Sequence, residues 1–171
     1  MWREKGREQG ERMTISLSKD EERDFDREIR SLASDPRCLR MKQFIQHGRI
    51  TTYEHSMNVA REAFRLNREW HAGADEKRLI TAAFLHDYFL YDWHTHGDRL
   101  HGYHHPRIAA ENAGRDFRVS ARTQKIILSH MWPLTFFHVP TSREAWLVTL
   151  ADKICSARET LFERGSGAGH H

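Results

Sequence analysis

Six side chains of the kinds that bind metal ions are spread over about a hundred residues of the sequence. They are four histidines and two aspartates, namely His55, His86, Asp87, His105, His130 and Asp152. Imidazole nitrogens and carboxylate oxygens are the ligands that borderline and hard divalent cations share. The set predicts a metal site assembled from several helices, and a metallohydrolase is the leading hypothesis.

Each of these residues has a simpler explanation when it is considered alone. The dipole of a helix stabilises an imidazole such as His130 at its C-terminus, and His105 suits a polar position at a helix start. His86-Asp87 fits a core histidine followed by a turn aspartate, and a salt bridge explains an inward Asp152 equally well. Without a metal, all of these explanations must hold at once, so the metal site is favoured.

Helix start and stop signals divide most of the chain into helices. Ser18–Glu21 has the form of a capping box, and helical spacing continues from it to Asp35-Pro36. Cys38–Ile45 predicts a short second helix, and a second capping box at Thr51–Glu54 opens a long third one. Four further helices are predicted. One starts at Asp75, one has Pro106 in its first turn, one starts at Ser120, and the last starts at a capping box over residues 141–144.

The fold class predicted from these signals is all-α, a compact bundle of about six to seven helices. No segment alternates apolar and polar residues for long enough to predict a strand, and Ile50-Thr51-Thr52 is too short. A chain of 171 residues suits one domain. We expect that domain over residues 15–163, after a disordered extension over 1–14 and before a flexible tail over 164–171, with Met13 as an alternative start.

Composition narrows the classes of protein that the chain can belong to. It has no run of about 18 apolar residues and no apolar core of a signal peptide, so we expect a cytoplasmic protein without a membrane partner. The formal charge is +3, but basic and acidic residues are interleaved, so no specific nucleic-acid surface is predicted. Cys38 and Cys155 lie in apolar helical patterns, which favours buried thiols over a disulfide. The oligomeric state stays open.

The ordered pattern of a histidine, a His-Asp pair and a distant aspartate resembles the HD-domain metal-dependent phosphohydrolase superfamily. His55, His86-Asp87 and Asp152 match that pattern, and the resemblance covers roughly residues 40 to 160. Leu-Ala-Asp-Lys at 150–153 also resembles the last motif of the family. His105 and His130 resemble two further histidines of dinuclear members.

The resemblance implies a ligand set for one or two divalent ions, with Fe, Mn, Zn, Mg, Co and Ni all compatible. One ion is implied for His55, His86, Asp87 and Asp152, and Asp87 then bridges to a second ion held by His105 and His130. His101 and His104 are the alternatives to His105. Leu90 replaces the lysine that HD-GYP phosphodiesterases and myo-inositol oxygenase carry, which argues against those two subfamilies.

A site of this kind supports metal-assisted hydrolysis of a phosphate ester, with a nucleotide or another small phosphorylated metabolite as the expected partner. Asp87 and Asp152 are candidates to orient the attacking water, with Lys153 as a further catalytic candidate. The histidine-rich segment over residues 88–105 is predicted to form a pocket wall or lid. Candidate substrate-binding residues are Arg99 and Arg107 for the phosphate, and Tyr88 and Trp93 for stacking. The alternative functions are an HD-type di-iron oxygenase and a non-catalytic module that retains the metal.

Overall fold

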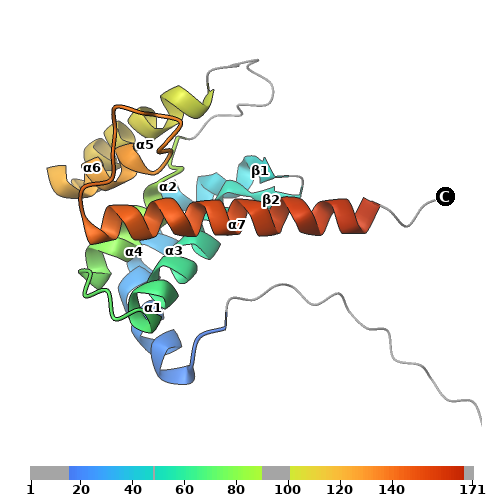
Figure 1. Cartoon of the computed structure of the whole chain (residues 1–171), viewed down its shortest axis with the longest axis horizontal. Coiled ribbons are helices and arrows are strands. Elements are labelled where there is room, and N and C mark those ends of the chain that lie inside the picture. Colours follow the sequence, from blue (N-terminus) through green and yellow to red (C-terminus); the bar gives the residue numbers. More distant parts are fainter. Residues whose placement is uncertain (1–15, 48, 90–100, 168–171) are drawn as a thin grey trace, which may run out of the picture.

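A computed structural model describes residues 16–47, 49–89 and 101–167, and the fold class is all-α, as predicted (Figure 1). The helices are α1 (Lys19–Ala33), α2 (Pro36–Leu39), the 3-10 helix η1 (Arg40–Gln43), α3 (Thr52–Glu69), α4 (Glu76–Leu85), α5 (His101–Phe117), α6 (Ala121–Ser129) and α7 (Arg143–Gly167). Two short strands, β1 (Ile45–His47) and β2 (Ile50–Thr51), form an antiparallel hairpin before α3.

The predicted capping signals explain where several of these helices begin. Ser18 and Thr51 each form a complete capping box, with Glu21 and Glu54 respectively. Asp75 and Ser120 cap α4 and α6 by accepting hydrogen bonds from backbone amides of the first turn. These caps fix the starts of α3, α4 and α6. His55 of the predicted metal set lies on α3, and His86 and His130 cap the ends of α4 and α6.

Three details differ from the sequence-based expectation. The region expected to be one short helix is divided into α2, η1 and the strand β1. The strand was not predicted because strands of two or three residues are too short to show an alternating apolar pattern. Helix α5 begins at His101, so Pro106 lies inside it rather than in its first turn. At the start of α7, the hydroxyl of Ser142 accepts the amide hydrogen bond of Ala145, one residue later than the predicted box.

The core lies where α3, α4 and α7 pack against one another. Helix α7 crosses the other helices in Figure 1, and both α3 and α4 contact it. Fully buried side chains such as Val59 and Phe64 on α3, Leu79 and Phe84 on α4, and Val148 on α7 fill the space between them. Cys38 and Cys155 are free, buried thiols, as predicted. Since the same three helices carry predicted metal ligands, this core also holds the site in place.

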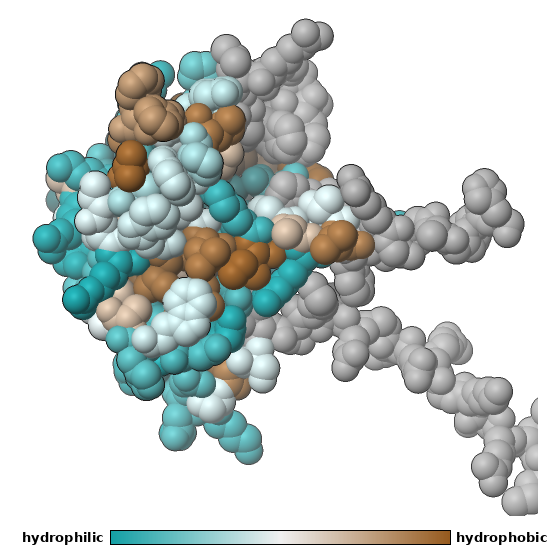
Figure 2. Space-filling view, in the orientation of Figure 1, coloured by the Kyte–Doolittle hydropathy of each residue, from teal (hydrophilic) through white to brown (hydrophobic). Residues whose placement is uncertain are grey.

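Helix α7 continues to Gly167, beyond the domain end that was predicted at residue 163. Apolar side chains stay exposed on the segment before it and on the helix itself, including Phe136, Phe137 and Trp146. Figure 2 shows apolar surface along this helix. Among the described helices, none is both long enough and apolar enough to cross a lipid bilayer.

Candidate metal centre

Five helices bring the six predicted ligands together at one buried place. His55 lies in the first turns of α3, His86-Asp87 follows the end of α4, His105 lies on α5, His130 caps the C-terminus of α6, and Asp152 lies on α7. All six residues are buried, with exposed fractions between 0% and 8%. A cluster of imidazoles and carboxylates removed from water in this way needs internal partners or a cation.

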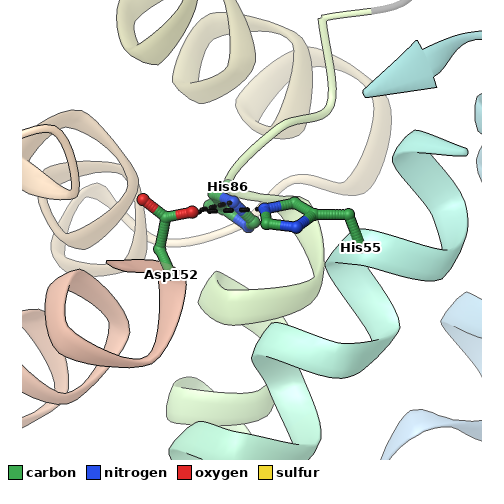
Figure 3. Close-up of side chains that lie close together, drawn as sticks. All are labelled: His55, His86 and Asp152. Carbon is green, nitrogen blue, oxygen red and sulfur yellow. Dashed lines mark hydrogen bonds and ion pairs between the residues drawn. The ribbon is translucent and has the colours of Figure 1, made fainter. Parts of the chain in front are cut away.

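The first group of ligand atoms consists of His55, His86 and Asp152, which converge from three helices (Figure 3). Oδ1 of Asp152 lies 3.2 Å from Nε2 of His55 and 3.6 Å from Nε2 of His86. The Nε2 atoms of both histidines therefore point at the same carboxylate oxygen, and all three ligand atoms lie within 4.8 Å of one another.

Asp87 stands between this group and a second one. Its Oδ2 lies 3.4 Å from Nε2 of His86 and 3.8 Å from Nε2 of His55. Its other oxygen, Oδ1, lies 3.3 Å from Nε2 of His105 and 3.7 Å from Nε2 of His130. The two oxygens of one carboxylate thus face two different pairs of imidazoles, which is the arrangement that a bridging ligand needs.

The second group contains His105 and His130, whose Nε2 atoms lie only 2.9 Å apart. Two imidazole nitrogens at hydrogen-bond distance can share one proton, so only one of them donates. The same separation matches two ligands at right angles around one ion, since metal–nitrogen bonds of ~2.05 Å give ~2.9 Å. The pair is thus equally suited to a shared proton in the metal-free protein and to a common ion.

Backbone contacts orient two of the four imidazoles. Nδ1 of His86 lies 2.7 Å from the carbonyl oxygen of Ala83, and Nδ1 of His130 lies 2.7 Å from that of Ile127. A carbonyl oxygen can only accept, so Nδ1 carries the proton in both rings and Nε2 is directed at the cluster. This is the tautomer that a metal ligand requires.

The ionisation of the cluster follows from burial and from its internal charges. Burial lowers the pKa of His55, but hydrogen bonds with Asp152 and Glu159 outweigh that effect and raise it to about 9. For His86 the charge of Asp87 likewise overcomes burial and raises the pKa well above its usual value. Burial and the neighbouring imidazoles lower the pKa of His130 to about 3, so that ring is neutral.

Both aspartates stay ionised in spite of their burial. Burial opposes ionisation, but the charge of His86 and the hydrogen bond of His105 lower the pKa of Asp87 well below its usual value. The pKa of Asp152 is also lowered well below the usual range, because hydrogen bonds from His55 and His86 outweigh burial. Two anionic carboxylates therefore lie among four imidazoles.

Two orphaned atoms show that the cluster fits a cation. Among the described residues, Nε2 of His86 and Oδ1 of Asp87 are buried and make no hydrogen bond of good geometry, because the imidazole and carboxylate atoms that face them stay 3.3 to 3.7 Å away. Buried polar atoms without a partner are costly unless something else contacts them. The spacings of 3.2 to 3.8 Å in the first group and around Asp87 bracket the ~3.3 Å between tetrahedral ligands of an ion with bonds of ~2.0–2.1 Å.

Comparison with protein families agrees with this geometry. The family model described as HD domain matches residues 52–157, which is more than half of the chain. The chain belongs to the HD domain family. That match confirms the resemblance inferred from the histidine and aspartate pattern. Searches of curated proteins and of solved structures found no match.

Two further side chains contact the ligands, and both lie just outside the residues that match the HD domain model. The side-chain amide of Gln46, on β1, donates a 2.6 Å hydrogen bond to Oδ2 of Asp87. Glu159, on α7, lies 2.8 Å from Nδ1 of His55 through its Oε2. Glu159 lies seven residues after Asp152, hence on the same side of a helix, and that spacing was the available signal. Gln46 had none, because its strand was not predicted.

The residues predicted to act on the substrate have different outcomes. The prediction for Tyr88 is wrong: its ring is fully buried against Phe117 and its hydroxyl donates to Asp116, so it has no surface for stacking. Arg107 is largely exposed and lies 3.9 Å from Glu111. Arg99 and Trp93, with most of the predicted lid, lie outside the described residues.

Lys153 is the remaining catalytic candidate, and it contacts a residue of the cluster. The ammonium group of Lys153 donates a 3.2 Å hydrogen bond to the carbonyl oxygen of His130, and burial lowers its pKa. Of the alternatives to His105, His104 is exposed, and the side chain of His101 lies outside the described part of the chain. Among the histidines of that segment whose side chains the structure describes, His105 is the one that faces Asp87.

Proposed function

We propose that this HD domain is a metal-dependent phosphohydrolase with two divalent ions, acting on a small phosphate ester such as a nucleotide. The observation that carries the proposal is the position of Asp87, whose Oδ2 faces His55 and His86 while Oδ1 faces His105 and His130. A carboxylate placed in this way would offer one oxygen to each of two ions, and paired ions of this kind hydrolyse phosphate esters.

Bound divalent ions would act as Lewis acids that activate water near neutral pH and offset the negative charge of a phosphoryl group. The protein supplies the rest. Asp87 and Asp152 remain ionised, so each offers a carboxylate oxygen to accept a hydrogen bond from an attacking water. His130 is neutral and keeps its Nε2 lone pair available, since its Nδ1 proton is held by the backbone.

Lys153 extends this arrangement toward the substrate. Its ammonium group donates to the backbone carbonyl of His130, which is itself one of the buried ligands. The rest of Lys153 is exposed, so the group lies between the cluster and solvent. A cation in that position can bind a phosphate oxygen without entering the ligand set. Replacing it should therefore raise KM more than it lowers kcat.

The proposal is tested with protein purified without chelator and reconstituted separately with Mn²⁺, Co²⁺, Zn²⁺ and Fe²⁺. Phosphate release is measured from p-nitrophenyl phosphate, bis-p-nitrophenyl phosphate and a nucleotide panel. Hydrolysis should be lost in Asp87→Ala and in His105→Ala, while His104→Ala, one residue away but exposed, serves as the matched control. Iron-dependent oxygen consumption with no phosphate release on any substrate would refute the hydrolase and favour the oxygenase.

A further inference from the structure

His55 differs from its neighbours in what holds its outer nitrogen. For His86 and His130 the partner of Nδ1 is a backbone carbonyl three residues earlier in the same chain segment. For His55 the partner is a carboxylate, Oε2 of Glu159, at 2.8 Å. A carboxylate carries a full negative charge where a carbonyl carries only a dipole, so it interacts more strongly with the imidazole N–H.

Glu159 is itself fixed between α3 and α7. Its side chain is 9% exposed, and its second oxygen, Oε1, accepts a 3.0 Å hydrogen bond from the side-chain amide of Asn58. Asn58 lies three residues after His55 on α3, and Glu159 lies seven residues after Asp152 on α7. Each helix therefore contributes one ligand and, at helical spacing along the same side, one residue that belongs to the support.

We propose that Glu159 is a positioning residue that makes the ion at His55, His86 and Asp152 bind more tightly than the ion at His105 and His130. This inference rests on the proposed metal centre. The carboxylate holds the proton on Nδ1 and directs Nε2 of His55 toward Asp152, 3.2 Å away, where a bound ion would replace the Nε2 proton. It also makes that nitrogen a stronger electron donor, an effect that the carbonyl partners of His86 and His130 provide only weakly.

Two substitutions separate the charge of Glu159 from its shape. Glu159→Gln keeps the size and an acceptor oxygen and removes the charge, and Asn58 can turn its amide over to remain paired. Glu159→Ala removes the contact altogether. Glu69→Gln, a charge change at an exposed carboxylate on the helix of His55, is the matched control.

The experiment titrates metal-free protein with Co²⁺ and follows heat and visible absorption, in the wild type and in a His105→Ala/His130→Ala background that isolates the first ion. Glu159→Gln should weaken the affinity for the first ion by about tenfold and Glu159→Ala by about 100-fold. These values span the usual loss of metal affinity when the hydrogen-bond partner of a ligand is replaced. The second ion and the Glu69→Gln control should be unchanged. Retained circular dichroism shows that the variants are folded.

Four outcomes are possible besides the expected one, and each has a defined meaning. Binding of the first ion within twofold of wild type in folded Glu159→Gln and Glu159→Ala overturns the inference, as does equal weakening of both ions, which indicates general loosening. If Glu159→Ala does not fold, Glu159→Gln alone decides, through the affinity and the cobalt spectrum of the first ion. Wild-type protein that binds no Co²⁺ overturns the proposed metal centre itself, so the two failures are distinguishable.

Discussion

Binding of the first divalent ion should release about two protons at pH 7. In the metal-free protein, His55 has a pKa of about 9 and His86 one well above its usual value, so both rings are protonated and face the ionised Asp87 and Asp152. Nε2 of each ring must lose its proton to become a ligand. Exchange of two protons for one divalent cation leaves the charge of this buried cluster unchanged, which avoids the cost of an uncompensated internal charge.

The size of the competition follows from the pKa of His55. At pH 7 that ring lies two pH units below its pKa of about 9. Its proton alone therefore weakens apparent metal affinity by a factor of about 100, or roughly 3 kcal/mol. With both rings protonated, the apparent Kd should fall by about two orders of magnitude for each pH unit between pH 7 and pH 8.

The assay is isothermal titration calorimetry with Co²⁺ in buffers of different ionisation enthalpy at a single pH. The slope of the observed enthalpy against the buffer enthalpy counts the protons released. Release of less than about half a proton per first ion, together with an apparent Kd that does not change between pH 7 and pH 8, would show that His55 and His86 are neutral in the metal-free protein. The electrostatic account of the cluster would then be refuted.

Further substitutions and conditions test the fold and its charges. In chelator, the raised pKa of His55 contributes stability that is fully present below pH ~6.5 and is lost as the pH rises through about 9, so the melting temperature should fall over that window. Tyr88→Phe should cost about 0.5–1.5 kcal/mol in urea unfolding and leave hydrolysis unchanged, since it removes only the hydrogen bond to Asp116; a loss of activity would contradict its place in the core. Phe64→Ala, at a fully buried position of α3, should cost about 3–5 kcal/mol, whereas Phe137→Ser, at a side chain 93% exposed, should change stability by less than about 0.5 kcal/mol.

The helices and the ligand set were predictable because each is encoded by local spacing or by residue type. Capping boxes at Ser18 and Thr51 are read within four residues, and each fixes a helix start. Four histidines and two aspartates stand out by their chemistry even when they are distant in sequence. Tyr88 was misassigned for the opposite reason: an aromatic residue beside a ligand pair serves a pocket or a core equally well, and only its contacts with Phe117 and Asp116 distinguish them.

The support of the ligands was not predictable, because it depends on contacts between elements. Helix α5 starts before Pro106 since a proline in the second turn removes a single backbone hydrogen bond, a cost that tertiary contacts can offset. The spacing of seven residues from Asp152 places Glu159 on the same side of α7, but the packing of α7 on α3 is what brings it to His55. Its role is a property of the assembled helices rather than of any motif.

The β1–β2 hairpin illustrates how a weak sequence signal can still control the site. The hydroxyl of Thr52 lies 3.3 Å from the carbonyl oxygen of Phe44 and 3.5 Å from Oε1 of Gln46, so it borders the amide oxygen while the amide NH₂ of Gln46 faces Asp87. That NH₂ donates to Oδ2 of Asp87 at 2.6 Å and thereby resists rotation of the carboxylate. Rotation matters here because each oxygen of Asp87 faces its own pair of histidines. A five-residue pairing that no periodicity reveals therefore holds the carboxylate on which the two-ion arrangement depends.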